Sequence, residues 1–134
     1  MTSVRIERDG DGTYTAHNGR GAVLRIAGDN FSPVELLLAA IGGCTAIDVD
    51  VVTTRRAEPD SFEVVVDAEK IKDETGGNRL KDVTVTFRIA FPEGVHGDEA
   101  RAILPDIVRK SHDRLCTVSR TVALGTPVTS VIEP

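Results

Sequence analysis

The stretch Ser32-Pro33-Val34-Glu35-Leu-Leu-Leu-Ala-Ala-Ile-Gly-Gly-Cys44-Thr decides the fold of this chain. A serine, a proline at the first helical position and a glutamate three residues after the serine form a capping box, which is typical of a helix start. Apolar residues then occupy nearly every helical face to residue 47, and the pattern continues to about residue 56. The sequence therefore predicts a helix of about 24 residues, roughly 36 Å long.

This helix is apolar on all sides, and a chain of 134 residues is too small to cover a helix of that length by itself. A second subunit would supply the missing cover, so we expect an obligate homodimer. The apolar stretch at residues 34–47 contains Glu35 and is shorter than the roughly 20 residues that a bilayer requires. We therefore expect a buried helix and no membrane span.

Strand patterns flank the helix on both sides. Before it, residues 2–8 and 13–17 alternate around an Asp-Gly turn and predict a hairpin, and residues 22–26 predict a third strand. After it, two β-rich runs are joined by a polar segment that contains two glycines. These runs, residues 62–68 and 83–91, predict a long hairpin.

The C-terminal part has a second helical pattern. It follows a possible Asp98 cap, and Pro105 should kink or divide this helix. Residues 117–123 could add a further helical turn, and residues 126–132 a final strand. This order of elements predicts an α+β fold, and no repeat or shift of composition divides the chain, so we expect one domain over residues 1–134.

Composition excludes several classes of protein. The net charge is −5, only five residues are aromatic, and no stripe of basic residues is present, which argues against a nucleic-acid partner. The N-terminus alternates charged residues where a secretory signal would be apolar, so we expect a cytoplasmic protein. In that reducing compartment the two cysteines, Cys44 and Cys116, are expected to begin as free thiols.

Cys44 follows two mid-helix glycines, which together cost about 2 kcal/mol of helix propensity relative to alanine. Glycine leaves room beside the thiol for a substrate, a second thiol or a crossing helix, and a buried structural cysteine fits the last case. Cys116 lies 72 residues further on, too far for a Cys-x-x-Cys motif or a zinc ribbon. His112, one helical turn before Cys116, could hold a metal, act as a base or be a satisfied histidine; no further ligands accompany it, so no metal or cofactor is expected.

The first stretch, together with Ser111-His-Asp-Arg-Leu-Cys116-Thr-Val-Ser119, resembles the two cysteine motifs of the OsmC/Ohr family. This family comprises osmotically inducible and organic hydroperoxide resistance proteins. The resemblance covers essentially the whole chain. It implies antiparallel sheets packed on a long central helix, in an intertwined homodimer with two active sites at the subunit interface.

The activity that the resemblance implies is that of a cysteine-based peroxidase without metal or flavin. Cys44 matches the peroxidatic position, whose thiolate attacks an organic hydroperoxide, releases an alcohol and becomes a sulfenic acid. Cys116 matches the resolving position, which would condense with that acid into a disulfide. A dithiol reductant, of the lipoyl type in this family, would reopen the disulfide by exchange.

The resemblance also implies a supporting arginine and glutamate. Arg20 matches the arginine that stabilises the thiolate, with Arg25 as the second candidate, although Arg20 could equally be a solvated turn residue. The family's glutamate lies ten residues before the cysteine, where this chain has Val34. The neighbouring Glu35 is about 180° around the helix from Cys44 and has a local role in the capping box, so its catalytic role stays open.

Two functions remain after the sequence analysis. The first is a thiol peroxidase that prefers organic hydroperoxides. The second, favoured by Val34, is a dimeric stress-associated or small-ligand-binding protein with inert buried thiols and an apolar pocket. A metal-dependent hydrolase is a third and more remote alternative. The sequence does not distinguish an enzyme from a peroxide sensor.

Overall fold

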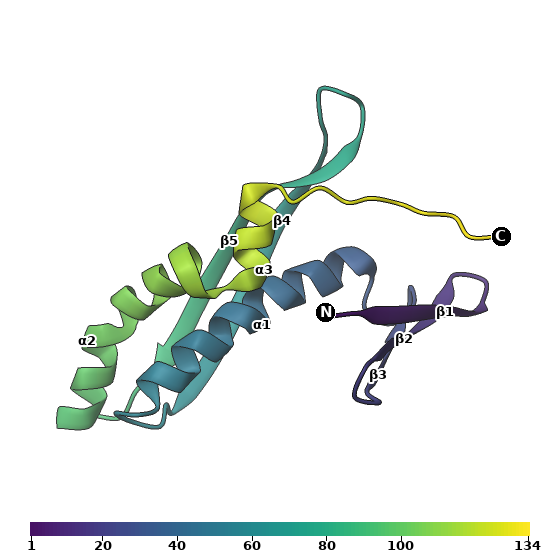
Figure 1. Cartoon of the computed structure of the whole chain (residues 1–134). Coiled ribbons are helices and arrows are strands. Elements are labelled where there is room, and N and C mark those ends of the chain that lie inside the picture. Colours follow the sequence, from purple (N-terminus) through teal and green to yellow (C-terminus); the bar gives the residue numbers. More distant parts are fainter. The chain divides into compact units, whose positions relative to one another are not determined.

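The computed structural model of the chain describes all 134 residues and divides into two compact units, residues 1–39 and 40–134. Three strands come first, followed by a long helix, two strands and three shorter helices (Figure 1). This is the predicted α+β class. The long helix α1 (Pro33–Thr53) begins in the first unit and continues in the second.

The N-terminal unit contains a three-stranded antiparallel sheet. Its strands β1 (Val4–Gly10), β2 (Thr13–Asn18) and β3 (Val23–Ile26) lie in the order β1-β2-β3. The tight turn between β1 and β2 places Gly12 at a φ of 68°, a conformation that glycine adopts without strain. The predicted hairpin and third strand are confirmed.

The start of α1 is the predicted capping box. The Ser32 amide donates to a Glu35 carboxylate oxygen over 2.9 Å, and the Glu35 amide donates to the Ser32 hydroxyl over 3.1 Å. These two hydrogen bonds satisfy amides that a helix start leaves unpaired. The helix ends at Thr53, about three residues before the expected end.

The C-terminal unit is built on a two-stranded antiparallel hairpin of β4 (Ser61–Lys72) and β5 (Asn78–Ala90). The hairpin was predicted, but both strands are longer than expected. Asp73 explains the extension, because its carboxylate accepts hydrogen bonds from the Thr75 amide at 2.9 Å and the Gly77 amide at 3.1 Å. These bonds close the turn locally and let the polar segment continue the two strands.

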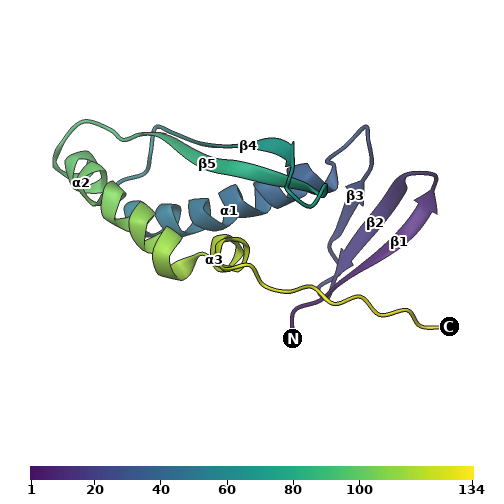
Figure 2. The same ribbon diagram turned by 90° about the horizontal axis from the view of Figure 1, so that it is seen from above.

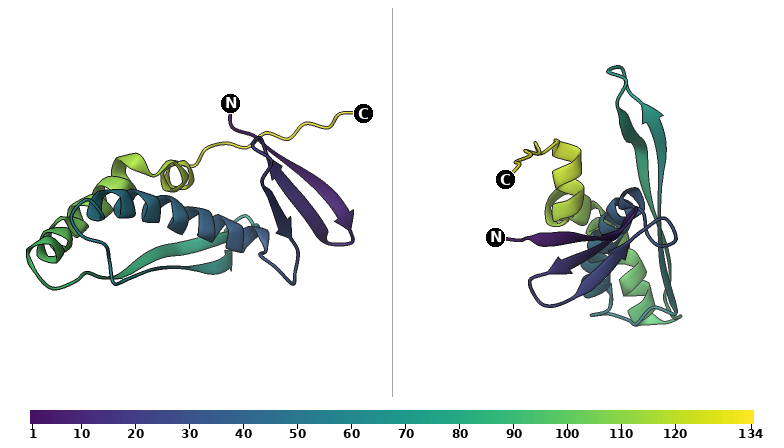
Figure 3. Two further views of the ribbon diagram at one scale, coloured as in Figure 1. Left: turned by 90° about the horizontal axis from the view of Figure 1, so that it is seen from below. Right: turned by 90° about the vertical axis from the view of Figure 1, so that its right-hand side faces the viewer.

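All helices of this unit lie on one face of the hairpin (Figures 2 and 3). They are α1, α2 (Val95–Lys110), a short π-helix η1 (Ser111–Leu115) and α3 (Thr117–Leu124). A Cβ atom added at Gly42 would lie 2.6 Å from the Val66 side chain, so this glycine lets α1 approach β4 closely. The space that Gly42 provides is therefore used for packing. A Cβ atom added at Gly43, in contrast, would meet no heavy atom within 4 Å beyond its chain neighbours and the backbone of its own helix.

The start of α2 differs from the prediction. The helix begins at Val95 with Gly94 as N-cap, at a φ of 117°, and Asp98 lies within the first turn rather than at the cap. The Asp98 amide donates to the Gly94 carbonyl over 2.9 Å, and its carboxylate pairs with Arg101. The prediction that Asp98 is the N-cap was wrong. Gly94 takes that position through a backbone conformation that favours glycine, and a search for capping side chains does not detect a glycine.

Pro105 does not divide α2, which continues to Lys110. A proline removes the hydrogen bond to the carbonyl four residues earlier, here that of Arg101. Both residues are exposed, so water can satisfy that carbonyl.

The expected final strand does not form. Residues 126–134 have no regular structure, and Val128, Val131 and Ile132 are almost fully exposed. A strand needs a neighbouring strand for its hydrogen bonds, and nothing in this chain pairs with the segment. The pattern of residues 126–132 was therefore misleading for the single chain.

By length and composition alone, α1 could cross a membrane. The expectation that its apolar run is too short for a bilayer is therefore wrong as a length argument. Four residues at helical spacing, Ile41, Thr45, Val49 and Thr53, are buried on one face of the helix. Such a face is typical of a core helix in a folded domain.

Candidate active site

The two cysteines meet in the C-terminal unit. Cys44 is half-buried on α1, and Cys116 is completely buried at the junction of η1 and α3. Both are free thiols, and the Cys44 thiol donates a hydrogen bond to the Cys116 sulfur. The fold thus brings two thiols that are 72 residues apart in the sequence into direct contact.

The first turn of α3 surrounds both sulfur atoms. The Val118 amide donates to the Cys44 sulfur, and the Ser119 amide donates to the Cys116 sulfur over 3.3 Å. The Ser119 hydroxyl lies 3.2 Å from the same Cys116 sulfur. The amides of a first helical turn lack partners in the helix and carry its partial positive charge. They are therefore suited to hold an anionic sulfur.

The two thiols differ in acidity. Burial raises the pKa of Cys44, as do the hydrogen bond that it donates to Cys116 and the negative charge of Asp48, whereas the Val118 amide lowers it. Burial also raises the pKa of Cys116, but the Ser119 hydroxyl, the Cys44 thiol and the Ser119 amide outweigh burial and leave this pKa below its usual range. Of the two thiols, Cys116 is therefore the more acidic.

A polar cluster joins α1 to η1 beside the thiols. The buried Ser111 hydroxyl donates to an Asp48 carboxylate oxygen over 2.7 Å and lies 2.8 Å from the Thr45 hydroxyl. Sequence analysis missed Asp48. Its position, one helical turn after Cys44, is the signal that could have identified it.

An apolar groove lies between β5 and the helices. It consists of two adjoining hollows of about 350 and about 230 Å³, which share Val83, Val85, His112 and Ser119. Thr45 and Ile41 of α1 also line it. Neither cysteine lines the groove, but Ser119 does, and the hydroxyl of Ser119 contacts the Cys116 sulfur. Its size and mainly apolar lining suit a small apolar ligand.

The profile of the family described as OsmC-like protein matches residues 26–131. The chain belongs to the OsmC-like protein family. An uncharacterized protein of Mycobacterium tuberculosis strain H37Rv is 28% identical over 132 residues, which cover 96% of this chain and 93% of that protein.

Two solved structures show the same fold at low sequence identity. An OsmC-like protein of unknown function from Vibrio cholerae has a TM-score of 0.73 at 13% identity, and the match covers 90% of this chain and 92% of that one. An organic hydroperoxide resistance protein from Elizabethkingia anophelis has a TM-score of 0.60 at 17% identity, with 90% and 87% covered. The predicted OsmC-like fold is thereby confirmed.

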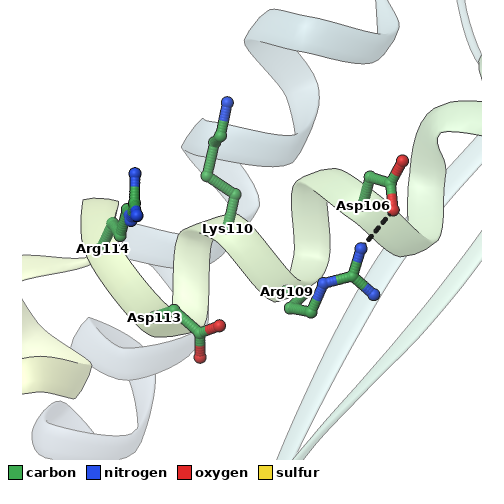
Figure 4. A pocket seen from close by; sticks show the side chains of 5 residues that line it. All are labelled: Asp106, Arg109, Lys110, Asp113 and Arg114. Carbon is green, nitrogen blue, oxygen red and sulfur yellow. Dashed lines mark hydrogen bonds and ion pairs between the residues drawn. The ribbon is translucent and has the colours of Figure 1, made fainter.

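A third hollow in this OsmC-like protein, apart from the groove, has a different character. It has a volume of about 360 Å³ and is lined only by charged side chains of α2 and η1, with Arg109 paired to Asp106 (Figure 4). The lining residues are Asp106, Arg109, Lys110, Asp113 and Arg114. It offers neither a thiol nor an apolar wall, so it does not suit a reaction at sulfur.

His112 faces solvent in the OsmC-like structure. Its side chain is 75% exposed, and its Nδ1 atom lies 3.0 Å from an Asp113 carboxylate oxygen. Of the three roles considered for His112, namely metal ligand, base and hydrogen-bonded surface residue, this geometry matches the last. No group of three or more histidine, cysteine, aspartate or glutamate side chains is arranged to hold a metal ion.

Arg20, Arg25 and Glu35 lie in the N-terminal unit. Arg20 is exposed in the turn after β2, where its amide donates to the Asn18 side chain over 2.9 Å. The Arg25 guanidinium lies 3.7 Å from Asp29. Glu35 is engaged in the capping box, and the hydrogen bonds from Ser32 lower its pKa. Pairing of Arg20 or Arg25 with a thiolate stays a prediction, and the family match begins after both.

Proposed function

We propose that this OsmC-like protein is a thiol-dependent peroxidase that reduces organic hydroperoxides. A sulfenic acid on Cys44 and a Cys44–Cys116 disulfide would be its intermediates. The observation that carries the proposal is the hydrogen-bonded pair of free thiols beside an apolar groove. Relatives of the same fold named organic hydroperoxide resistance proteins add support for this class of substrate.

The first step takes place at Cys44, because this sulfur is half-buried whereas Cys116 is inaccessible. The Cys44 proton moves along the hydrogen bond to Cys116, and the resulting thiolate attacks the distal peroxide oxygen. A sulfur–oxygen bond forms and the oxygen–oxygen bond breaks. The departing alkoxide takes the proton from Cys116 and leaves as an alcohol. Cys44 is oxidised by two electrons to a sulfenic acid.

The second step forms the disulfide. The Cys116 thiolate attacks the Cys44 sulfur, a sulfur–sulfur bond forms, and hydroxide leaves. A dithiol, which we propose to be of the lipoyl type, then reduces the disulfide by exchange and is itself oxidised. The apolar groove beside the thiols would bind the organic part of the substrate, so organic hydroperoxides should react faster than hydrogen peroxide.

The variant Cys116→Ser should permit one oxidation and no resolution. One equivalent of cumene hydroperoxide is expected to convert Cys44 into a sulfenic acid, because the attacking thiol is retained, but more slowly than in the unmodified protein, because Cys116 no longer accepts the Cys44 proton. Mass spectrometry after dimedone labelling measures the adduct, and the unmodified protein, which should form the disulfide instead, is the control. Sustained turnover of Cys116→Ser with a dithiol would contradict the assigned role.

We also propose that the protein acts as a homodimer. Gly43, Ile47 and Val51 are spaced by one helical turn and form an exposed stripe on α1. Ile47 is 65% exposed, and nothing in this chain occupies the space beside Gly43. A helix of a second copy would use that space, since a glycine allows two backbones to approach closely. The exposed apolar residues of the C-terminal tail add to the uncovered surface.

Sedimentation velocity tests the dimer. At micromolar concentration we expect a particle of about twice the 14.4 kDa chain mass, and Ile47→Asp should shift it toward the monomer because a charge would be buried without a partner. Val95→Asp, at an exposed site at the start of α2, is the matched control and should stay dimeric. A stable, folded monomer of the unmodified chain would end the dimer proposal.

One observation favours the non-catalytic alternative. The raised pKa of Cys44 is typical of an inert buried thiol, and the groove could bind a small apolar ligand without any reaction. This protein would then use the OsmC-like fold for binding only. A hydroperoxide distinguishes the two functions, because it should oxidise the thiols of a peroxidase to a disulfide and leave those of a binding protein unmodified.

A further inference from the structure

Ser119 is engaged with a sulfur atom although neither the cysteine motifs nor the family match assigns it a role. Its amide lies 3.3 Å and its hydroxyl 3.2 Å from the Cys116 sulfur, which is completely shielded from solvent. Cys116 is at the same time the N-cap residue of α3, with extended backbone angles. The amide and the hydroxyl of one residue therefore converge on a single buried sulfur at the positive end of a helix.

We propose that Ser119 is a further catalytic residue, which holds the Cys116 sulfur as a thiolate before the peroxide arrives and so activates the second thiol for disulfide formation. The inference rests on the peroxidase function proposed above. In the neutral form the Cys116 thiol donates to the Ser119 hydroxyl; in the anion that hydroxyl rotates and donates to sulfur. The Ser119 amide donates in both forms.

The chemical consequence concerns the resolving step. The Cys116 thiolate supplies the electron pair for the sulfur–sulfur bond, the sulfur–oxygen bond of the Cys44 sulfenic acid breaks, and hydroxide leaves and takes a proton from solvent. A neutral thiol at Cys116 would first have to lose its proton to a base. Of the residues that line the groove beside Ser119, Val83 and Val85 are apolar, and the His112 ring is hydrogen-bonded to Asp113 and not to the Cys116 sulfur.

Other charged and titratable groups act on this sulfur from the neighbouring elements. On α1 the Cys44 thiol favours the Cys116 thiolate by donating to it, whereas Asp48 opposes the thiolate through its negative charge. On η1, His112 lines the groove beside Ser119, and its ring is paired with Asp113. Arg120 of α3 is engaged with the Asp113 carbonyl. Ser119 and the Cys44 thiol together thus offset burial and the charge of Asp48, and Ser119 does so through both its hydroxyl and its amide.

The first test isolates Cys116 in a Cys44→Ser background, where serine can still donate to the sulfur. Thiolate absorbance near 240 nm, followed against pH, should give a midpoint below the ordinary value of about 8.5. Adding Ser119→Ala should raise the midpoint by about one unit, because a donor to the charged form is lost. Thr121→Ala, two positions further along α3, removes a hydroxyl that donates only to the Thr117 carbonyl and should leave the midpoint unchanged.

The second test follows disulfide formation in the two-cysteine protein after one equivalent of cumene hydroperoxide. Below the midpoint, Ser119→Ala should form the disulfide about threefold more slowly, because a tenfold smaller thiolate fraction is partly offset by higher intrinsic nucleophilicity. Well above the midpoint the variant should be faster, since the thiolate fraction no longer differs. A merely structural role for Ser119 would not produce this crossing of the two pH profiles.

The results separate the inference from the function on which it rests. If the unmodified protein is not oxidised at Cys44, the peroxidase proposal fails, while the titration still decides whether Ser119 holds the thiolate. A midpoint at or above about 8.5 in Cys44→Ser, or one that Ser119→Ala does not move, overturns the inference. If the alanine variant does not fold, the isosteric pair Ser119→Thr and Ser119→Val decides it, because only threonine keeps the hydroxyl and should keep the low midpoint.

Discussion

Replacing Cys44 with serine is expected to lower hydroperoxide reduction by about a thousandfold or more. The reaction needs a nucleophile that is anionic near neutral pH and can accept an oxygen atom, and a serine hydroxyl does neither. Serine is close to cysteine in size and can still accept the hydrogen bond from the Val118 amide, so the half-buried site should remain folded. Consumption of cumene hydroperoxide with a dithiol reductant measures the effect.

The control for this variant is Ala40→Ser, an exposed substitution that introduces the same side chain on the same helix. It should retain full activity. Thermal unfolding of both variants checks that the fold is intact. If Cys44→Ser retained activity within tenfold of the unmodified protein, Cys44 would not be the nucleophile.

The second large effect concerns stability. Gly97→Ala should destabilise the protein by about 3 kcal/mol. A Cβ atom at this position would lie 1.7 Å from the Pro92 carbonyl oxygen and 2.8 Å from its carbon, and both belong to the backbone. The clash can be relieved only by moving the connection between β5 and α2. This cost exceeds the roughly 1 kcal/mol by which alanine favours a helix over glycine.

Chemical denaturation at one fixed protein concentration measures this loss, since the stability of an oligomer depends on concentration. Gly28→Ala is the matched control. Gly28 is exposed, has no positive φ and would place its Cβ in open space, so the substitution should be neutral or slightly stabilising. Equal stability of Gly97→Ala and the unmodified protein would show that α2 does not start against Pro92 as described.

The parts of the fold that depend on neighbours in sequence were predictable. The capping box at Ser32 and Glu35 is a local arrangement, and its two hydrogen bonds form as expected. The Asp-Gly turn likewise determines the first hairpin. The final strand at residues 126–132 was not predictable, because a strand depends on whether a partner strand is present.

The site was predictable only in part. The motifs identified Cys44 and Cys116, but the contact between them depends on how α1 and α3 pack, which the sequence does not show. Ser119 and Asp48 were missed for the same reason. Ser119 contacts the Cys116 sulfur, and Asp48 on α1 affects the pKa of Cys116, only because the helices pack together. The two mid-helix glycines have different roles. A side chain at Gly42 would clash with Val66, whereas Gly43 faces open space in the single chain.

The central claim is that Cys44 and Cys116 form one redox pair. A nonreducing peptide map by mass spectrometry, made after one equivalent of an organic hydroperoxide and in parallel after one equivalent of hydrogen peroxide, tests it most directly. The account predicts a Cys44–Cys116 disulfide that forms rapidly and faster with the organic substrate. Two unmodified thiols in the folded protein would contradict the peroxidase function and leave ligand binding in the apolar groove as the remaining function.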